Sequence, residues 1–210
     1  MFDQTHVSQH PLVLHKLTLL RSRVTEPKKF RQLLREVSRL LLYEATRDLE
    51  MAPLDVQTPL GDCLSYEVIE QVALVPILRA GLGMSEAILD IIPTANVWHV
   101  GVYRNEKTLE PILYYQNQIS LDGVDLVFVI DPMLATGGSA IAAIDIIRQK
   151  STTCRIKFLG LIAAPEGLFA LTQAHPDVAI HLAAIDSHLD EDGYIVPGLG
   201  DAGDREFATE

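Results

Sequence analysis

Residues 127–139 read Val-Phe-Val-Ile-Asp-Pro-Met-Leu-Ala-Thr-Gly-Gly-Ser, and an alanine- and isoleucine-rich segment follows them. The apolar run 127–130 predicts a buried strand, and Asp131 stands where that strand ends. The Thr-Gly-Gly-Ser string predicts the start of a helix. In open α/β sheets, ligands bind in the crevice beyond the carboxyl ends of the strands. The stretch therefore predicts a strand, a short loop and a helix, with Asp131 facing a ligand crevice.

The chemistry of this loop favours a sugar phosphate. A helix N-terminus offers unpaired N–H groups and a partial positive charge, and glycines let a phosphate approach the backbone closely. An acid beside that anion site can accept hydrogen bonds from sugar hydroxyls. The Gly-Lys-Ser/Thr ending of a Walker loop is absent, and so is Gly-x-Gly-x-x-Gly. The plainer alternative is that Thr136 only caps the helix and Asp131 only sits in a turn.

Strand-like and helix-like segments alternate after Pro53, which predicts an α/β fold with a mainly parallel sheet flanked by helices. The strand-like runs are continuous in apolar residues, as expected where helices cover both faces of a sheet. They span 72–78, 97–103, 124–130, 156–163 and 178–185, and helical patterns span 83–91, 139–149 and 166–174. We expect a single domain over 1–210, with a core at 66–186.

The first 50 residues are predicted to be helical, with one segment after Pro11 and another from Pro27 to Leu49. Thr25 is a candidate cap for the second segment. Three arginines, Arg31, Arg35 and Arg39, recur every four residues along it. A solvated helix face is the simplest interpretation of that spacing, and a subunit contact or an anion site is the alternative.

Composition excludes several classes of protein. The chain is 48% hydrophobic, which is too apolar for a disordered protein. Its formal net charge of −11 disfavours sequence-independent binding to nucleic acid. Two cysteines, Cys63 and Cys154, are too few for a disulfide scaffold, and we expect both to be buried and inert. We expect no signal peptide and no membrane span.

Three further segments are candidates for ligand contacts. Arg79 ends the strand-like run 72–78 and precedes a small-residue turn, where a guanidinium could fork onto a polyanion. Arg104 lies in a predicted β-hairpin arm at about 103–118, which could close over a leaving group, although a solvated hairpin tip is the alternative. The glycine-rich end at about 187–210 contains Asp201 and is predicted to form a hood whose backbone reads a flat heterocycle, or else a flexible tail.

These motifs together resemble the uracil phosphoribosyltransferase family over about residues 10–207. The Asp-Pro-Met-Leu-Ala-Thr-Gly-Gly-Ser string at 131–139 and the Pro-Gly-Leu-Gly-Asp-Ala-Gly-Asp string at 197–204 are specific to that family. Matches also lie at 43–46, 76–83, 103–111, 164–167 and 175–177. General phosphoribosyltransferases carry two adjacent acids where this chain has Asp131-Pro132, which is the uracil-specific form. The stretch 55–71 is less familiar.

The resemblance implies a type I phosphoribosyltransferase fold with a C-terminal hood and a protruding β-arm used in dimerisation. It implies that uracil and 5-phosphoribosyl 1-diphosphate (PRPP) react to give UMP and diphosphate, in pyrimidine salvage. It assigns Arg79, Arg104 and Asp201 to catalysis and the same three residues to PRPP. The other implied PRPP contacts are Asp131, Pro132, Met133, Leu134, Ala135, Thr136, Gly137, Gly138 and Ser139, and the implied uracil contacts are Ile195, Gly200, Asp201 and Ala202.

The resemblance also implies Mg²⁺ bound mainly through PRPP, with no dedicated protein metal site, GTP as an effector, a homodimer or higher homo-oligomer, and a cytoplasmic location. Two rivals stay open at this point. One is a nucleotide-binding regulator of RNA, for which the basic residues between Lys16 and Arg47 could form a patch. The other is a purine phosphoribosyltransferase, which the Asp131-Pro132 pair and the hood disfavour.

Overall fold

A twisted, mostly parallel sheet forms the centre of the protein in the computed structural model, which describes residues 4–104, 111–117 and 120–209. The described strands follow the spatial order β1-β12-β10-β8-β4-β6-β7, and all neighbours are parallel except the edge pair β6 and β7. The short β5 (Asn96–Val97) also pairs with β4. The bounds are β1 Thr5–Val7, β4 Val72–Leu78, β6 Val100–Arg104, β7 Pro111–Gln116, β8 Leu126–Ile130, β10 Arg155–Leu159 and β12 Ala179–Leu182.

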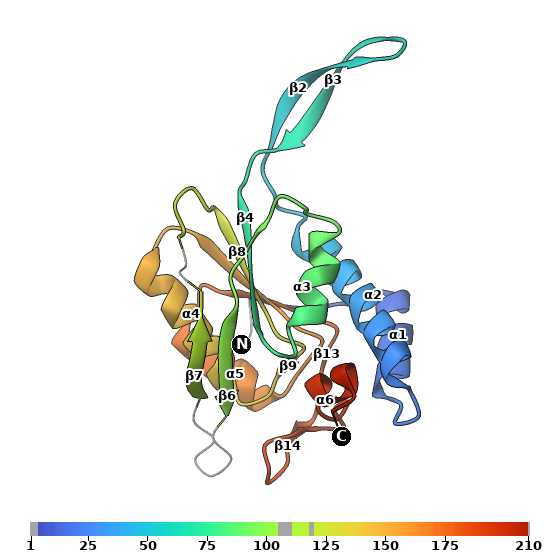
Figure 1. Ribbon diagram of the computed structural model, residues 1–210, viewed down its shortest axis with the longest axis vertical. Coiled ribbons are helices and arrows are strands. Elements are labelled where there is room, and N and C mark those ends of the chain that lie inside the picture. The colour runs from blue at the N-terminus through green and yellow to red at the C-terminus, as the bar shows by residue number, and fades with distance from the viewer. Residues whose placement is uncertain (1–3, 105–110, 118–119, 210) are drawn as a thin grey trace.

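Helices cover both faces of the sheet, and this explains the continuous apolar runs of its strands (Figure 1). In β8, Leu126, Phe128 and Ile130 pack in the core that the N-terminal helices share, whereas Val127 and Val129 pack in the opposite core. The first core lies under α1 (Pro11–Arg21), α2 (Pro27–Ala45) and α3 (Leu82–Leu89). The second lies under α4 (Gly138–Lys150) and α5 (Pro165–Ala174). The predicted α/β class is confirmed.

Three of the predicted strands are divided in the structure, and the run 97–103 is shared between β5 and β6. The runs 156–163 and 178–185 leave the central sheet and continue into a small parallel sheet of β9 (Met133–Leu134), β11 (Ile162–Ala163) and β13 (Ala184–Ile185). The change of direction falls at Gly160 and Leu161, whose amides donate to His181 O and Pro132 O. Hydrophobicity alone does not show such a break, because both halves of each run are buried.

The N-terminal helices differ from the predictions in two contacts. Thr25 does not cap α2, because Glu26 is the N-cap residue and the Thr25 hydroxyl donates instead to Leu19 O at 2.6 Å. The arginine row on α2 is not simply solvated. Arg35 donates to Glu86, Arg39 pairs with Asp90, and Arg31 donates to a carbonyl near the C-terminus. The row therefore fastens α2 to α3 and to the C-terminal helix.

A long two-stranded hairpin extends away from the body (Figure 1). It consists of β2 (Met51–Thr58) and β3 (Gly61–Val68), in a region for which the sequence suggested no element. The segment predicted as the arm, 103–118, does contain a hairpin of β6 and β7, but these strands form the edge of the central sheet. Residues 105–110 and 118 of that segment lie outside the described residues. Cys63 lies on β3 and is exposed, which corrects the expectation of a buried thiol, whereas Cys154 is buried.

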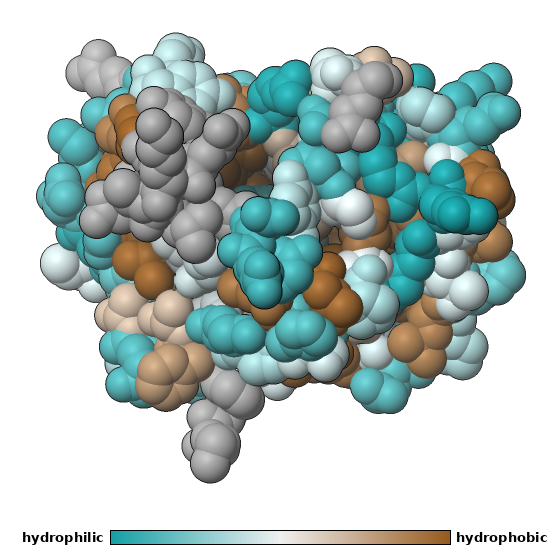
Figure 2. Space-filling view, turned by 90° about the horizontal axis from the view of Figure 1, so that it is seen from below, coloured by the Kyte–Doolittle hydropathy of each residue, from teal (hydrophilic) through white to brown (hydrophobic). Residues whose placement is uncertain are grey.

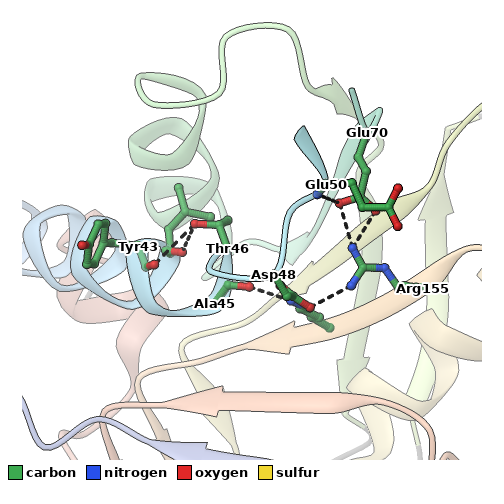
Figure 3. A network of polar contacts seen from close by, with 9 residues as sticks. Tyr43, Ala45, Thr46, Asp48, Glu50, Glu70 and Arg155 are labelled. Atoms are coloured by element: carbon green, nitrogen blue, oxygen red, sulfur yellow. Dashed lines mark hydrogen bonds and ion pairs between the residues drawn. The ribbon is translucent and has the colours of Figure 1, made fainter. Parts of the chain in front are cut away.

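Charged side chains attach the base of the β2–β3 hairpin to the sheet (Figure 3). Glu70 accepts hydrogen bonds from the Glu50 amide at 3.0 Å and from the Arg155 guanidinium at 2.6 and 2.8 Å. Arg155 also donates to Asp48, which in turn pairs with the buried ammonium of Lys157. The two ends of the hairpin are thereby tied to β10, because Arg155 and Lys157 both lie on that strand.

The chain ends in a hood over the carboxyl ends of the strands, as the sequence predicted for about 187–210. It consists of β14 (His188–Leu189), β15 (Ile195–Val196) and α6 (Ala202–Phe207) with the loops between them. Figure 1 places α6 between the ends of the central strands and the end of α1. Within the described part of the chain, no helix is both long enough and apolar enough to cross a membrane.

Candidate active site

Two loops meet where the neighbouring strands β4 and β8 end. The strands are parallel and in register from Val72 opposite Leu126 to Pro76 opposite Ile130, so their carboxyl ends share one edge. The turn after β4 begins with the cis Leu78–Arg79 peptide. A side chain at Gly81 would place its Cβ 2.5 Å from Ile130 O, so only glycine lets this turn lie against the end of β8. The arrangement brings Arg79 and Asp131 to the same edge of the sheet, where both line one pocket.

The loop after β8 is more ordered than a simple connection. The Met133 amide donates to Asp131 Oδ1 at 3.3 Å, and Met133–Leu134 then form β9. Gly137 is the N-cap residue of α4 and has φ of +84°. This left-handed conformation costs glycine little and is unfavourable for residues that carry a Cβ. Thr136 therefore is not the cap that the plainer alternative required. The N-terminus of α4 opens directly onto the loop 131–137.

These loops line a pocket of about 200 Å³. Nine residues that the sequence predicted are among those that line it: Arg79, Asp131, Met133, Leu134, Ala135, Thr136, Gly137, Ser139 and Asp201. Sequence reasoning missed Ile77, Leu78, Ala80, Val102 and Ala140, which complete the wall. Leu78 and Ala80 flank Arg79 and could have been inferred from its position, but Val102 on β6 carries no sequence signal for a pocket.

Burial makes the carboxyl group of Asp131 unusually hard to ionise. It is half-buried at the end of β8, and this burial, followed by the nearby charge of Asp201, raises the pKa of Asp131 to about 7. The hydrogen bond from the Met133 amide opposes the rise. Two acids that share a pocket in this way are suited to cations or hydroxyl donors, because either would lower the cost of the buried negative charge.

The hood supplies one wall of the pocket through Asp201. This residue is the N-cap of α6, and its Oδ1 accepts from the Asp204 amide at 2.9 Å. Asp204 also contacts Arg79, with Nη2 to Oδ1 at 3.3 Å, and the Arg79 guanidinium carbon lies 5.8 Å from the centre of the Phe207 ring. The hood and the β4 turn therefore touch across the mouth of the pocket.

The three other residues implied for uracil lie in the hood but not on the wall of this pocket. Ile195 and Ala202 are buried, and Gly200 is exposed next to Asp201. Pro132 and Gly138 belong to the 131–139 segment and likewise do not line the pocket. Arg104 ends β6, but its side chain lies outside the described residues, so its predicted contact with diphosphate stays a prediction.

Helix α6 also carries a buried acid. Glu206 is 2% exposed, and its Oε2 has no hydrogen-bond partner among the described residues. Burial, followed by the charge of Glu86, raises the pKa of Glu206 to about 7. Its carboxyl group packs against Gly83 in the first turn of α3, where a Cβ would meet Oε1 at 1.9 Å. The hood is thus packed closely on the helix that follows the Arg79 turn.

The carboxylates on the pocket wall could serve as ligands for a Mg²⁺ ion that arrives with a phosphorylated substrate. Mg²⁺ prefers oxygen ligands and commonly takes one or two carboxylates together with substrate phosphates. Asp131 and Asp201 are two such carboxylates. Within the described residues, no cluster of three or more His, Cys, Asp or Glu side chains could hold a metal by itself.

Figure 2 views this end of the molecule, where hydrophilic and hydrophobic residues are interspersed.

Comparisons with known proteins agree on one family. Residues 7–209 match the family described as uracil phosphoribosyltransferase. A protein named uracil phosphoribosyltransferase from Roseiflexus sp. (strain RS-1) is 62% identical over 206 residues, which cover 98% of this chain and 99% of the relative. One of the same name from Lactiplantibacillus plantarum is 50% identical over 205 residues, which cover 97% and 98%.

Solved structures show the same fold. A protein from Aquifex aeolicus superimposes with a TM-score of 0.92 at 38% identity, covering 98% of this chain and 99% of that one. An adenine phosphoribosyltransferase from Thermoanaerobacter pseudethanolicus gives a TM-score of 0.50 at 11% identity, with 76% and 84% covered. At that identity the likeness concerns the fold alone.

Proposed function

The chain belongs to the uracil phosphoribosyltransferase family, and from this premise we propose that the pocket at the ends of β4 and β8 is where it joins uracil to PRPP. The enzyme is a pentosyltransferase that forms UMP and diphosphate in pyrimidine salvage. One observation carries the assignment of the site. Arg79, Asp131 and Asp201 come from three separate segments and line the same pocket beside the N-terminus of α4.

The α4 end of the pocket binds the 5-phosphate of the ribose. The amides of Thr136, Gly137, Gly138 and Ser139 surround the anion, because a helix N-terminus presents unpaired donors and a partial positive charge. Pro132, Met133, Leu134 and Ala135 complete this contact. Asp131 accepts hydrogen bonds from the ribose hydroxyls, and these bonds stabilise the ionised carboxylate that burial disfavours.

Arg79 and Arg104 bind the diphosphate. In the reaction the bond between the anomeric carbon and the diphosphate oxygen breaks, N1 of uracil bonds to that carbon, and the N1 proton is lost. The transition state resembles an oxocarbenium ion, so the guanidinium groups neutralise the charge that grows on the leaving group, and Asp201 faces the sugar. No nucleophilic side chain is required, because most of the acceleration comes from position and electrostatics.

Mg²⁺ fits this site, with the carboxylates of Asp131 and Asp201 available to it and with most of its ligands coming from PRPP. When bound, the ion supplies further neutralisation of the diphosphate charge. The residues of the chain orient the sugar and the base and exclude water between them.

The hood reads uracil through its backbone. Ile195, Gly200, Asp201 and Ala202 present main-chain groups to the base, so that O4 of uracil accepts from an amide and N3–H donates to a carbonyl. A site built from such donors and acceptors discriminates by hydrogen-bond pattern, because a mismatched base leaves buried polar groups unpaired.

Four further properties of the family extend the proposal to this chain. The enzyme functions as a homodimer or a higher homo-oligomer, GTP acts as an effector, its location is cytoplasmic, and it has no nucleic-acid partner. The exposed β2–β3 hairpin supports an intersubunit contact, because Leu60, Leu64 and Tyr66 expose apolar surface on it. The net charge of −11 argues against a role on RNA.

One experiment tests the whole assignment. The purified chain is incubated with uracil, PRPP and Mg²⁺, and UMP and diphosphate are measured by chromatography. We expect both products in equal amounts, and none when PRPP is omitted. Adenine and hypoxanthine in place of uracil serve as the purine control. Products from a purine but not from uracil would contradict the assignment of the base.

A further inference from the structure

Arg205 joins the hood to the end of α1. Its Nη1 donates to Leu20 O and to Leu199 O, both at 2.6 Å, and its Nη2 donates to Ser22 O at 2.7 Å. The guanidinium carbon also lies 4.5 Å from the centre of the Phe30 ring. One side chain on α6 therefore connects the last turn of α1, the start of α2 and the loop that precedes α6.

Arg21 makes a second connection beside the first. It forms a bidentate ion pair with Asp186 and donates from Nη1 to Gly198 O at 2.7 Å. Asp186 Oδ2 accepts from the Gly198 amide at 2.9 Å, and the Asp186 side chain is only 4% exposed. Two consecutive carbonyls of the hood loop, at Gly198 and Leu199, are thus held by arginines. We call Arg21 and Arg205 the hood brace.

The hood brace lies outside the pocket, since neither arginine lines its wall. Its effect on the pocket passes through the geometry of the peptide bond. The Leu199–Gly200 peptide is trans, and in a trans peptide the carbonyl and the following amide point in opposite directions. Because Arg205 holds Leu199 O on the side of α1, the amide of Gly200 points away from Arg205 and α1, in the residue that precedes Asp201.

We infer that Arg205 is a positioning residue for base recognition, which turns the Gly200 amide toward uracil by holding the Leu199 carbonyl from behind. The inference rests on the proposed function, because it takes Gly200 as a backbone contact to the base. Arg205 itself touches no substrate. The bond is charge-assisted and partly buried, which is the kind whose removal has the largest effect.

A merely structural role for Arg205 predicts a different result. If Arg205 only fastened the hood, its loss would lower stability and impair both substrates together, because Asp201 in the same loop faces PRPP. A positioning role predicts a selective effect on uracil. The steady-state KM for uracil should rise by about tenfold or more in Arg205→Ala, while the KM for PRPP stays within about twofold.

The experiment compares three variants with the wild-type enzyme. Arg205→Ala removes the brace, Arg205→Lys keeps a charge that can reach a carbonyl but not three, and Arg148→Ala is the matched control. Arg148 also donates to a backbone carbonyl, Cys154 O at 2.9 Å, and pairs with an acid, Asp177, but it lies at the far end of α4. We expect Arg148→Ala to leave both KM values unchanged, and Arg205→Lys to fall between wild type and Arg205→Ala.

Chemical rescue gives a second readout, because a structural role predicts rescue of both KM values together, whereas a positioning role predicts rescue of the KM for uracil alone. Guanidinium or methylguanidinium added to Arg205→Ala should lower the KM for uracil toward the wild-type value, with no such effect on Arg148→Ala. If Arg205→Ala does not fold, the KM values of Arg205→Lys decide the question in the same way. Equal changes in the two KM values, or an unchanged KM for uracil, would overturn the inference. Failure of the wild type to form UMP would instead reject the proposed function.

Discussion

The loop 131–139 and the hood approach the same pocket, but they are held in place differently. The loop follows from β8, whose residues are buried on both faces of the sheet, and it leads into the thirteen-residue helix α4. The hood contains two strands of two residues each and the six-residue helix α6. It is attached by the buried side chains of Ile195, Leu199 and Ala202, which join the core under α1 and α2, and by arginine side chains that donate to backbone carbonyls.

The difference indicates a division of work between the two regions. Backbone ladders and a packed core fix the end of the pocket that we propose binds phosphate, and that role would require its amides in one geometry. The end that we propose binds the base is assembled from short elements, whose positions depend on a few buried apolar side chains and on charged hydrogen bonds between distant segments. Substitutions in the first region should affect PRPP, and those in the hood should affect the base, except at Asp201 and Asp204, which lie toward PRPP and Arg79.

The largest effect expected from this comparison is the rejection of cytosine at the hood. Cytosine presents an amino donor where uracil presents O4, so an amide donor of the hood would face another donor. We expect kcat/KM for cytosine to be lower than for uracil by about 10⁴-fold. Competition assays with both bases would measure the ratio. 5-Fluorouracil keeps O4 and N3–H and is the control that should be accepted. Comparable rates on cytosine would remove the backbone reading of the base.

Replacement of Arg79 tests the phosphate end. Arg79→Ala should lower kcat/KM for PRPP by about 10²-fold, because a cation facing the leaving diphosphate is lost. Stability should hardly change, since the Arg79 side chain is 56% exposed and its ion pair with Asp204 spans 3.3 Å at the surface.

Arg35→Ala is the matched control for Arg79→Ala. Its side chain is 34% exposed and pairs with Glu86, away from the pocket wall. We expect wild-type kinetics from this variant, with thermal unfolding followed for both. Unchanged kinetics of Arg79→Ala would take Arg79 out of the site.

The buried acid at the end of β8 gives a pH-dependent prediction. The folded-state pKa of Asp131 is about 7, above the value of about 3.9 for an unfolded chain, so its contribution to stability is present below pH 4 and is lost as pH rises through 7. Asp131→Asn has no side chain that ionises at this position, so the variant should not lose stability here as pH rises. The ligand-free variant should be more stable than wild type by about 2 kcal/mol at pH 8, and the gap should be smaller at pH 5.

Urea unfolding at the two pH values would measure that gap, even though the variant is expected to be inactive. Asp122→Asn, in an exposed turn that does not line the pocket, is the control for the same substitution elsewhere. A gap that is the same at pH 5 and pH 8 would mean that Asp131 is ionised in the free protein throughout this range.

The smallest effect concerns the contact between the hood and the turn after β4. Asp204 on α6 holds Arg79 across the mouth of the pocket, so diphosphate has to compete with that carboxylate. Asp204→Asn should lower the KM for PRPP by no more than about fivefold, as befits an exposed ion pair. Initial rates over a range of PRPP concentrations would show this, with the KM for uracil as the internal reference. A raised KM for PRPP would mean that Asp204 helps to bind it.

Sequence reasoning performed best where the pattern is local. The strand 72–78 was predicted residue for residue, and the acid, loop and glycine start of α4 followed from one continuous string. It performed worst where contacts are long-range. The arginine row on α2 read as a solvated face because its partners Glu86 and Asp90 lie far along the chain. The β2–β3 hairpin was missed because its exposed strands lack the apolar periodicity that marks a buried sheet.

By itself, the sequence determined the α/β class and the family, and it predicted the side chains that we propose carry the chemistry, because hydrophobic period, strand-end residues and glycine positions are properties of neighbouring residues. The tertiary structure decided which of those side chains share one pocket, how burial raises the pKa of Asp131, and which carbonyls Arg21 and Arg205 hold. Every residue except proline offers the same backbone donor and acceptor, so only the folded arrangement selects which of them a distant arginine meets.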